Sequence, residues 1–544
     1  MSAYGAQLAQ RRAEYVAWIA ATFRALEPDL ALTDGRLWAL SHARLHLGQD
    51  VDCANRYFAS VALTQDADIF FIRHLQTLLD FRDSPRLSAA AREHLTALLT
   101  AWPDTERTSV ARWPCWHTEN HDLMQLTIGL FARQVRGQDL AEQIRQTDQF
   151  LTWRFQRGWV EWNSPCYQVH FVHPLMVLIE HAPSPALRRK ASDLLNVLLA
   201  ERAVLGVNGY LGGPAFRCRT ADAYGSPTAR KVTYLEDNRY DGLLPTIWLA
   251  FGLGEPRFDF AAARVPGLEP AGEHYASGNE PRLKQDEGML FACSAWEPHP
   301  LVVALAQEAL TRPELIYEGQ RFIGWPNDEA WATQRWLPAR LTYYNTPHIS
   351  LASVHSDGWI CQSRYSNVMF AADPSQNLRL EIILPDAPVT KRRHESRGRL
   401  VQHQDWLLGQ GTVFEDGGVR AHRVGTWDVY RVGRGLCAHF ALADDHHVLQ
   451  VSDLDRYPTE QDFVQALALP DMSGHEVRAA SLDGDRLVVD TRDMSLAVNG
   501  KDRPHPPAML HDCPDMRSAY GSGKITLQTE AGTVVFDGTR ALAD

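Results

Sequence analysis

Residues 6–26, AQLAQRRAEYVAWIAATFRAL, carry the pattern that dominates the first part of this chain of 544 residues. Apolar side chains such as Val16, Ile19 and Phe23 recur every three or four residues, as on one face of an α-helix. Similar segments, separated by short breakers, continue to about residue 252. This succession predicts antiparallel helical hairpins, which either close into a toroid or continue as an open solenoid.

After residue 340 the apolar side chains alternate with a period of two. Residues 378–383, 427–432 and 532–536 read as strands, and turn signals such as Asn499-Gly500 separate segments of this kind. Many short strands with turns between them favour an antiparallel sandwich. Since the chain is also too long for one ordinary core, we predict an α+β protein of two domains. Residues 1–325 form the helical domain, and residues 330–544 form the antiparallel β-sandwich.

Charge and cysteine usage restrict the partners and the compartment. The net charge of −12 opposes general binding to nucleic acid, although an acidic polymer needs only a locally basic cleft. The eight cysteines show no CxxC spacing and read as free thiols. No signal-peptide pattern is visible in residues 1–12, and no apolar run is long enough to span a bilayer. We therefore expect a cytoplasmic protein with no membrane partner, unless a leader has been removed.

Two runs concentrate the chemistry. Trp116-His117-Thr118-Glu119-Asn120-His121-Asp122 gathers an amide, imidazoles and carboxylates before a helical segment. Glu161-Trp162-Asn163-Ser164-Pro165-Cys166-Tyr167 follows, and it places a tyrosine after the Asn–His pair. An Asn–His pair followed by a Tyr is what a uronic-acid lyase needs.

The chemistry of that reaction explains the residue types. The C5–H of a hexuronate is a poor carbon acid until its carboxylate is hydrogen-bonded or charge-paired. Asn120 and His121 provide donors for this neutralisation. Tyr167 acts as a base toward C5, as an acid toward the O4 leaving group, or as both. No metal or redox cofactor is required, and we expect none.

The order Asn120, His121, Tyr167 resembles that of the polysaccharide lyases built from an (α/α) toroid and an antiparallel β-sandwich, the alginate-lyase and heparinase II/III type. The resemblance implies a toroid, an Asn that neutralises the substrate and a Tyr that transfers protons. It also implies a further Tyr or His from the sandwich. The possible matches are Tyr343, Tyr344, His348 and His355, of which we take the last three as catalytic candidates.

Some heparinase-like relatives carry a structural metal in the sandwich. His403, Asp405, His439 and His446 are possible ligands here. Their spacing is not that of a tight ligand set, so we expect no metal.

Substrate contacts are predicted around the catalytic groups. A guanidinium binds a carboxylate in bidentate fashion, so an Arg in the loop Gly212-Gly213-Pro214-Ala215-Phe216-Arg217-Cys218-Arg219 would grip a neighbouring uronate. The substrate-binding candidates are Trp116, Glu119, Glu161, Arg217, Arg219, Tyr224 and Tyr240.

Two other function classes remain open at this point. An inverting glycoside hydrolase would use two carboxylates about 6.5–9.5 Å apart, drawn from Glu119, Asp122, Glu161, Glu236 and Asp237. A non-catalytic glycan-binding protein would use the aromatic residues alone. We predict a lyase acting on an acidic polysaccharide or oligosaccharide, with the identity of the uronate left open. The missing leader favours exo action on imported oligosaccharides.

Overall fold

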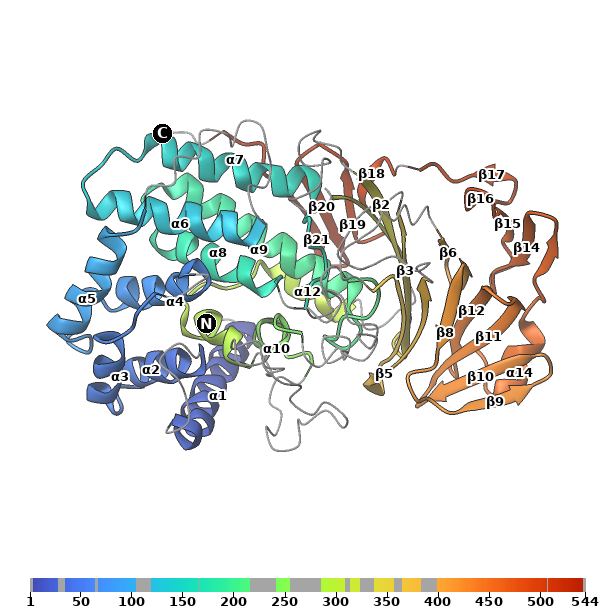
Figure 1. Ribbon diagram of the computed structural model, residues 1–544, viewed down its shortest axis with the longest axis horizontal. Coiled ribbons are helices and arrows are strands. Elements are labelled where there is room, and N and C mark those ends of the chain that lie inside the picture. The colour runs from blue at the N-terminus through green and yellow to red at the C-terminus, as the bar shows by residue number, and fades with distance from the viewer. Residues whose placement is uncertain are drawn as a thin grey trace.

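The computed structural model describes residues 3–27, 35–63, 67–103, 119–165, 167–215, 241–254, 285–308, 314–322, 337–356, 364–382, 399–505 and 507–541. Helices dominate the first part of the chain and strands the second, so the protein is a mixed α and β structure, as the change of apolar period predicts. Figure 1 shows the helices on the left and the stacked sheets on the right.

The helices pack largely against their neighbours in the chain. Those before the first strand are α1 (Ala3–Leu26), α2 (Gly35–Leu47), α3 (Val51–Phe58), α4 (Ala67–Asp80), α5 (Ala89–Thr100), α6 (Glu119–Val135), α7 (Ala141–Arg157), α8 (Val169–His181), α9 (Pro185–Leu205), α10 (Leu244–Phe251), η7 (Gln285–Gly288), α11 (Met289–Cys293) and α12 (Pro300–Glu308). Helices α4, α6 and α8 pack on one another, and α5, α7 and α9 cover them. The predicted hairpins are therefore present.

Helix α8 was not marked by the helical period of the sequence. Its sequence, VHFVHPLMVLIEH, is apolar on nearly every side and contains Pro174. Every residue from Val169 to Leu178 is buried, because α8 is surrounded by α4, α6, α9 and α11. A helix that is buried all round has no polar face, and periodicity then gives no signal.

The described strands form three antiparallel sheets. The first has the order β21-β20-β19-β18-β1-β2-β3-β4-β5-β8, the second β6-β7-β12-β11-β10-β9 and the third β13-β14-β15-β16-β17. Sheet one contains β1 (Glu314–Phe322), β2 (Leu337–Asn345), β3 (Ile349–Ser356), β4 (Ser366–Phe370), β5 (Asp373–Ile382), β8 (Thr412–Glu415), β18 (Met509–Asp512), β19 (Met516–Ala519), β20 (Lys524–Thr529) and β21 (Gly532–Asp537). Sheet two contains β6 (Leu400–His403), β7 (Trp406–Gln410), β9 (Ala421–Val424), β10 (Trp427–Val432), β11 (Gly435–Ala443) and β12 (His446–Asp453). Sheet three contains β13 (Asp471–Ser473), β14 (Glu476–Ala480), β15 (Arg486–Asp490), β16 (Ser495–Val498) and β17 (Lys501–Asp502).

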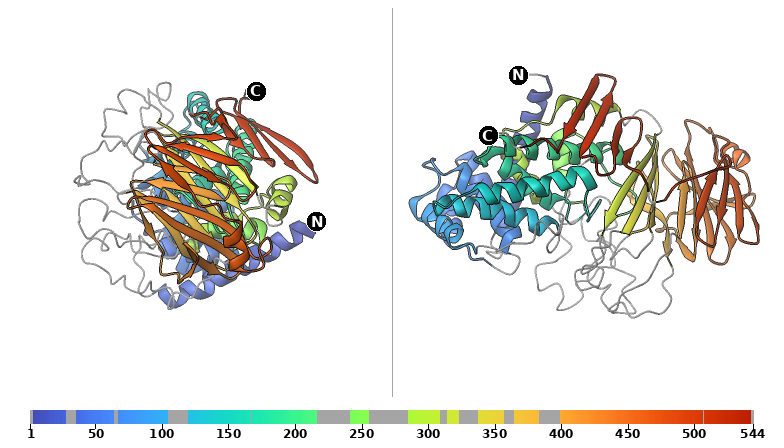
Figure 2. Two further views of the ribbon diagram at one scale, coloured as in Figure 1. Left: turned by 90° about the vertical axis from the view of Figure 1, so that its right-hand side faces the viewer. Right: turned by 90° about the horizontal axis from the view of Figure 1, so that it is seen from above.

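The second sheet is the middle layer of this stack. Successive residues of a strand point to opposite faces, and Leu407 belongs to the core shared with sheet one, whereas Leu408 belongs to the core shared with sheet three. Likewise, Cys437 belongs to the core shared with sheet one and Leu436 to the core shared with sheet three. The stack seen in Figures 1 and 2 thus has one layer more than a two-sheet sandwich.

The last strands return to the first sheet. β18 pairs with β1, and the hairpin of β20 and β21 packs against α7, α9 and α12. Figure 2 shows these red strands beside the helices. The end of the chain therefore contacts both the first sheet and the helical part.

The predicted hairpin turn at Asn499-Gly500 is present in the structure. Asn499 and Gly500 both have positive φ, 51° and 76°, between the paired strands β16 and β17, as a tight hairpin turn requires. The first strand begins at Glu314, earlier than the boundary at 325, and helix α14 (Glu460–Ala466) interrupts the strand-rich part. The division into two domains stays a prediction.

Cysteine state and membrane spans were also predicted from the sequence. Cys53, Cys293, Cys437 and Cys513 are free thiols, as predicted. Among the helices in the described ranges, none is both long and apolar enough to cross a bilayer.

Candidate functional site

The first turns of three central helices carry the candidate site. Asp68 lies in the first turn of α4, Asn120 and His121 in the first turn of α6, and His170 in that of α8. Tyr167 lies just before α8. The opening turn of a helix presents unpaired N–H groups and the positive end of the helix dipole. Such turns bind anions.

His121 and Asp68 join two of these turns directly. Nδ1 of His121 lies 2.8 Å from Oδ2 of Asp68, and Gln125 also donates to that carboxylate at 3.4 Å. The Asp68 side chain is 4% exposed and that of His121 is 24% exposed, so the imidazole reaches the surface and the carboxylate does not. A carboxylate at Nδ1 keeps a proton on that nitrogen and sets the orientation of the ring.

A buried ionic network joins α4 to α8 one turn further along each helix. Arg73 of α4 contacts Glu287 of η7 at 2.6 Å, and Nε2 of His173 in α8 lies 3.3 Å from the same carboxylate oxygen. All three side chains are at most 3% exposed. The network joins α4 and α8 through Glu287, one turn beyond the first turn of each helix. The rings of Tyr167, His170 and His173 are successive neighbours: the Tyr167 ring lies 6.2 Å from that of His170, and the His170 ring lies 5.9 Å from that of His173.

Glu119 and Glu161 are both buried in the interior of the protein. Glu119 is fully buried, forms an ion pair with Arg154 and accepts a 2.6 Å hydrogen bond from the backbone N–H of Glu161. Burial raises the pKa of Glu119 to about 7, against the opposing effect of the Arg154 charge. Glu161 is 2% exposed. Their predicted role in substrate contact is not supported by this burial.

The segment before Tyr167 is fastened to the first sheet. Asn163 has a positive φ of 54° and donates to the Tyr343 hydroxyl at 2.5 Å. The Ser164 hydroxyl accepts from the backbone N–H of Tyr167 at 3.2 Å. Gly213 has a φ of +88° and packs against the Tyr343 ring. An added Cβ at this position would lie 2.6 Å from that ring. The sheet therefore positions the Tyr167 segment through Tyr343.

Tyr344, His348 and His355 do not extend toward the helical first turns. Tyr343 faces the helices, so its neighbour Tyr344 points to the other face, where burial and the nearby Asp405 carboxylate raise its pKa. His348 bonds Asp455 at 2.8 Å. His355 bonds the carbonyl of Leu400 in β6 at 3.1 Å. The expected approach of these three residues to the site is therefore not supported: strand alternation directs Tyr344 and His355 toward sheet two, and His348, in the turn between β2 and β3, is bonded to Asp455.

Several predicted residues fall outside the described ranges. These are Trp116, Arg217, Arg219, Tyr224 and Tyr240, together with Glu236 and Asp237 of the hydrolase alternative.

The possible sandwich ligands are each bonded to a different group. His403 bonds Asp485 at 2.9 Å, Asp405 accepts from Gln450 at 2.6 Å, His439 contacts His447 at 3.1 Å and His446 contacts Asp445 at 2.7 Å. These pairings give no support to a shared metal site at the four positions.

Four residues that hold the candidate site in place were not singled out from the sequence. They are Asp68, Arg73, His173 and Glu287. The sequence did contain a pattern that could have indicated His173. His170 and His173 stand three positions apart within an otherwise apolar segment, which places two imidazoles on one helical face.

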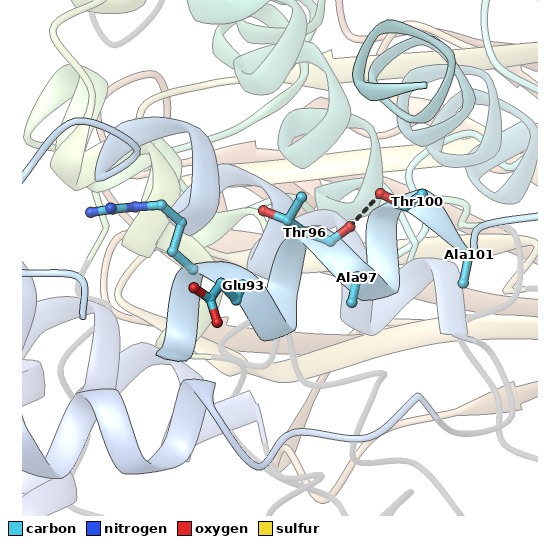
Figure 3. A pocket seen from close by; sticks show the side chains of 6 residues that line it. Glu93, Thr96, Ala97, Thr100 and Ala101 are labelled. Atoms are coloured by element: carbon cyan, nitrogen blue, oxygen red, sulfur yellow. Dashed lines mark hydrogen bonds between the residues drawn. The ribbon is translucent and has the colours of Figure 1, made fainter. Parts of the chain in front are cut away.

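A separate hollow lies on the surface of α5. It has a volume of about 580 Å³ and is lined by Arg92, Glu93, Thr96, Ala97, Thr100 and Ala101 (Figure 3). Thr100 donates to the carbonyl of Thr96 at 2.8 Å, and Arg92 donates to two carbonyls. Since every lining residue belongs to one helix or its end, the hollow lacks the convergence of several elements that typifies a ligand site.

Comparison with known proteins adds no assignment: no family profile, curated protein or solved structure matches the chain.

Proposed function

We propose that the protein is a lyase that cleaves a uronic-acid-containing glycan by β-elimination. The observation that carries the proposal is the Asp68–His121 pair at the first turns of α4 and α6, next to Asn120 and on the same helical core as Tyr167. This set combines an oriented imidazole, an amide and a phenol with helix ends that favour an anion.

Neutralisation of the substrate carboxylate is assigned to His121, whose side chain is 24% exposed, together with its neighbour Asn120, which is 0% exposed and reaches the substrate only if the first turn of α6 opens. As charge develops on the carboxylate during removal of the C5 proton, fixed donors stabilise it. His121 contributes an imidazole whose ring is held in place by Asp68 at 2.8 Å. The dipole of α6 adds positive potential at the same place.

Proton transfer is assigned to Tyr167. Its phenolate removes the C5 proton, the electron pair of that C–H bond forms the C4–C5 double bond, and the C4–O4 bond breaks. The proton carried by Tyr167 then passes to the departing O4 oxygen. Tyr167 is half-buried and lies at the start of α8, which suits a group that must reach a substrate.

The scaffold is proposed to be an (α/α) toroid. This finer description is supported by the arrangement in which α4, α6 and α8 pack together and α5, α7 and α9 cover them. The first sheet contributes Tyr343, which we assign as a positioning residue because it bonds Asn163 in the Tyr167 segment.

The hydrolase alternative is less well supported. It requires two carboxylates that can reach a glycosidic oxygen and a water. Glu119 is instead fully buried against Arg154, and Asp122 and Glu161 are 3% and 2% exposed. Asn120 is buried as deeply at 0% exposed, so the preference for the lyase rests on the exposure of His121 and Tyr167. The lyase assignment needs none of these carboxylates.

A panel of polyuronates tests the proposal. Purified protein is incubated with alginate, glucuronan, pectate and glycosaminoglycans, and the ultraviolet absorbance of the conjugated unsaturated uronate is followed. Mass spectrometry then distinguishes elimination from hydrolysis, whose product is heavier by one water. Products that are both unsaturated and lighter support the proposal. Saturated products would identify a hydrolase, and a lack of turnover across the panel would favour a glycan-binding protein.

A further inference from the structure

Two guanidinium groups lie near each other on the face of the first sheet that is turned away from the candidate site. Tyr343 of β2 faces the helices, so Arg340, three positions earlier in the same strand, faces the other way. Arg503 follows β17, and its guanidinium lies 4.2 Å from the centroid of the Tyr317 ring. Arg340 donates to the carbonyl of Pro504, the residue after Arg503. The segment that contains Arg503 therefore crosses this face of the sheet beside Arg340.

The strands next to β2 explain how this segment comes so close. Gly319 is the direct partner of Arg340 in β1, and an added Cβ there would collide with the backbone of Met509. A glycine at this position lets the segment before β18 pack on the sheet. His355 is the partner of Arg340 in β3, and its ring lies 4.5 Å from that of His505. Two imidazoles are thus placed beside the guanidinium groups.

Neither guanidinium is paired with a carboxylate of the described residues. Within those ranges, no carboxylate oxygen lies within 4.0 Å of a nitrogen of Arg340 or Arg503. Asp512 acts on Arg340 from a greater distance. Asp485 is bonded at 2.9 Å to Nε2 of His403, whose Nδ1 accepts from Arg503 at 2.8 Å. Asp485 and Asp512 therefore offer opposite charge only from outside direct contact.

This arrangement differs from that of other buried arginines in the protein. Those that form an ion pair with a carboxylate include Arg73, Arg154 and Arg202. Arg340 is only 9% exposed, and burial lowers its pKa to about 10, with the charge of Arg503 acting in the same direction. A buried charge is costly unless it is paired, and a second like charge nearby adds to the cost. One bound anion would compensate both guanidinium groups.

We propose that Arg340 and Arg503 together bind one doubly charged tetrahedral oxyanion, a phosphate or sulfate group. Planar guanidinium groups donate pairs of parallel hydrogen bonds to such oxygens, and two of them match the charge of a dianion. The ligand is either the free ion or the same group in an ester. Pro504, between the two sides of the site, is exposed and so leaves a path for a ligand.

The bound anion has a role that is independent of the proposed elimination, because it lies on the opposite face of the sheet from Tyr343. It joins β2 to the segment after β17. Since only the folded chain brings Arg340 and Arg503 together, binding stabilises the fold.

Anion titration of the full chain tests the proposal. Phosphate, sulfate and glycerol phosphate are each titrated into the protein by calorimetry, and thermal unfolding is followed in parallel. Chloride keeps the ionic strength constant, and low anion concentrations avoid the general stabilisation that phosphate and sulfate cause. We expect one saturable site per chain and a higher Tm than in chloride alone. A wild-type protein with no saturable binding of any of the three anions would overturn the proposal.

The same titration distinguishes the two sources of the ligand. Tighter binding of glycerol phosphate than of phosphate would support the site and identify an ester as its ligand. Tighter binding of the free ions would support the site and identify an inorganic ion.

Variants locate the anion. Arg340→Gln and Arg503→Gln should each weaken binding at least roughly tenfold, because each removes one charged donor group. Arg379→Gln in β5 is the matched control. Arg379 lies in the same sheet with a side chain that is 14% exposed, but it contacts Glu415 at 2.9 Å, so this variant should bind the anion as the wild type does. Unchanged affinity in both Arg340→Gln and Arg503→Gln would refute the site.

Hydrogen–deuterium exchange of the wild type decides if these variants do not fold by circular dichroism. Exchange is measured by mass spectrometry with and without phosphate, at the same ionic strength. Slower exchange with phosphate in peptides from residues 337–345 and 499–505 supports the site. Slowing that is confined to other segments refutes it.

Discussion

The imidazole of His121 is held by the carboxylate of Asp68 at 2.8 Å, although 53 residues separate them in the chain. The contact exists because α4 and α6 pack side by side with their first turns together. It fixes the orientation of the His121 ring through Nδ1. In the proposed reaction, this pair sets the charge and direction of the group that meets the substrate carboxylate.

Asp68→Asn tests that orientation. The amide keeps the size of the side chain but removes the negative charge that favours the protonated imidazole. By comparison with the loss of an orienting aspartate in a serine protease, which costs about 10⁴ in kcat, we expect a fall of at least roughly 10² here, with KM little changed. Gln125→Ala, which removes the 3.4 Å donor to Asp68 but keeps the carboxylate, is the control. Equal rates for Asp68→Asn and Gln125→Ala would remove Asp68 from this role.

Tyr343→Phe and Tyr344→Phe form a contrast between adjacent residues on opposite faces of β2. Tyr343→Phe removes the acceptor of the Asn163 amide in a buried place, so we expect a loss of about 1–3 kcal/mol in the free energy of unfolding. The rate should also fall, because the Tyr167 segment loses its anchor. Tyr344→Phe should leave kcat near the wild-type value. Denaturant unfolding and steady-state kinetics measure both effects, and a larger kinetic loss in Tyr344→Phe would reverse the assignment.

Arg154→Met tests the structural role of Glu119. The change leaves a buried carboxylate without its partner, and breaking a buried ion pair from one side costs about 3–5 kcal/mol. Chemical denaturation at neutral pH measures the loss. The double variant Glu119→Gln/Arg154→Met should recover part of it, because the uncharged Gln still accepts from the Glu161 N–H. A single variant as stable as the wild type would contradict the assignment.

Acid should destabilise the protein through His42. This side chain is fully buried, and burial lowers its pKa from 6.5 to about 4. Between these values the unfolded chain binds a proton that the folded chain does not, so stability is lost as pH falls from about 6.5 to about 4. The loss from a shift of this size is roughly 3 kcal/mol. The free energy of unfolding, measured with denaturant from pH 7 to pH 4, should depend less steeply on pH in His42→Gln than in the wild type. His422→Gln, at a 60% exposed side chain, should keep the wild-type slope. The same slope in all three proteins would exclude His42 as the cause.

The sequence predicted what depends on local pattern. The periods of residues 6–26 and 427–432 indicated α1 and β10, and Asn499-Gly500 indicated a hairpin turn. Helix α8 was not predicted, because burial on every side removes the amphipathic signal. The pairing of β18 with β1 was not predicted either, because pairing between strands far apart in the chain leaves no local sequence pattern.

The site was predictable only in part for the same reason. Asn120, His121 and Tyr167 stand in short polar runs that sequence reasoning can find. The partners that hold them, Asp68 and Tyr343, are brought by tertiary packing. Tyr343 and Tyr344 are chemically alike and adjacent, and only the register of β2 against the helices separates them.

The central claim is that Tyr167 transfers the proton in a β-elimination, and one kinetic comparison tests it most directly. Wild type and Tyr167→Phe are assayed by ultraviolet absorbance on the best polyuronate, with circular dichroism to confirm folding. The substitution removes only a hydroxyl, so the account predicts a fall of about 10²–10⁴ in kcat with KM nearly unchanged. A folded Tyr167→Phe protein that forms unsaturated product at the wild-type kcat would contradict the account.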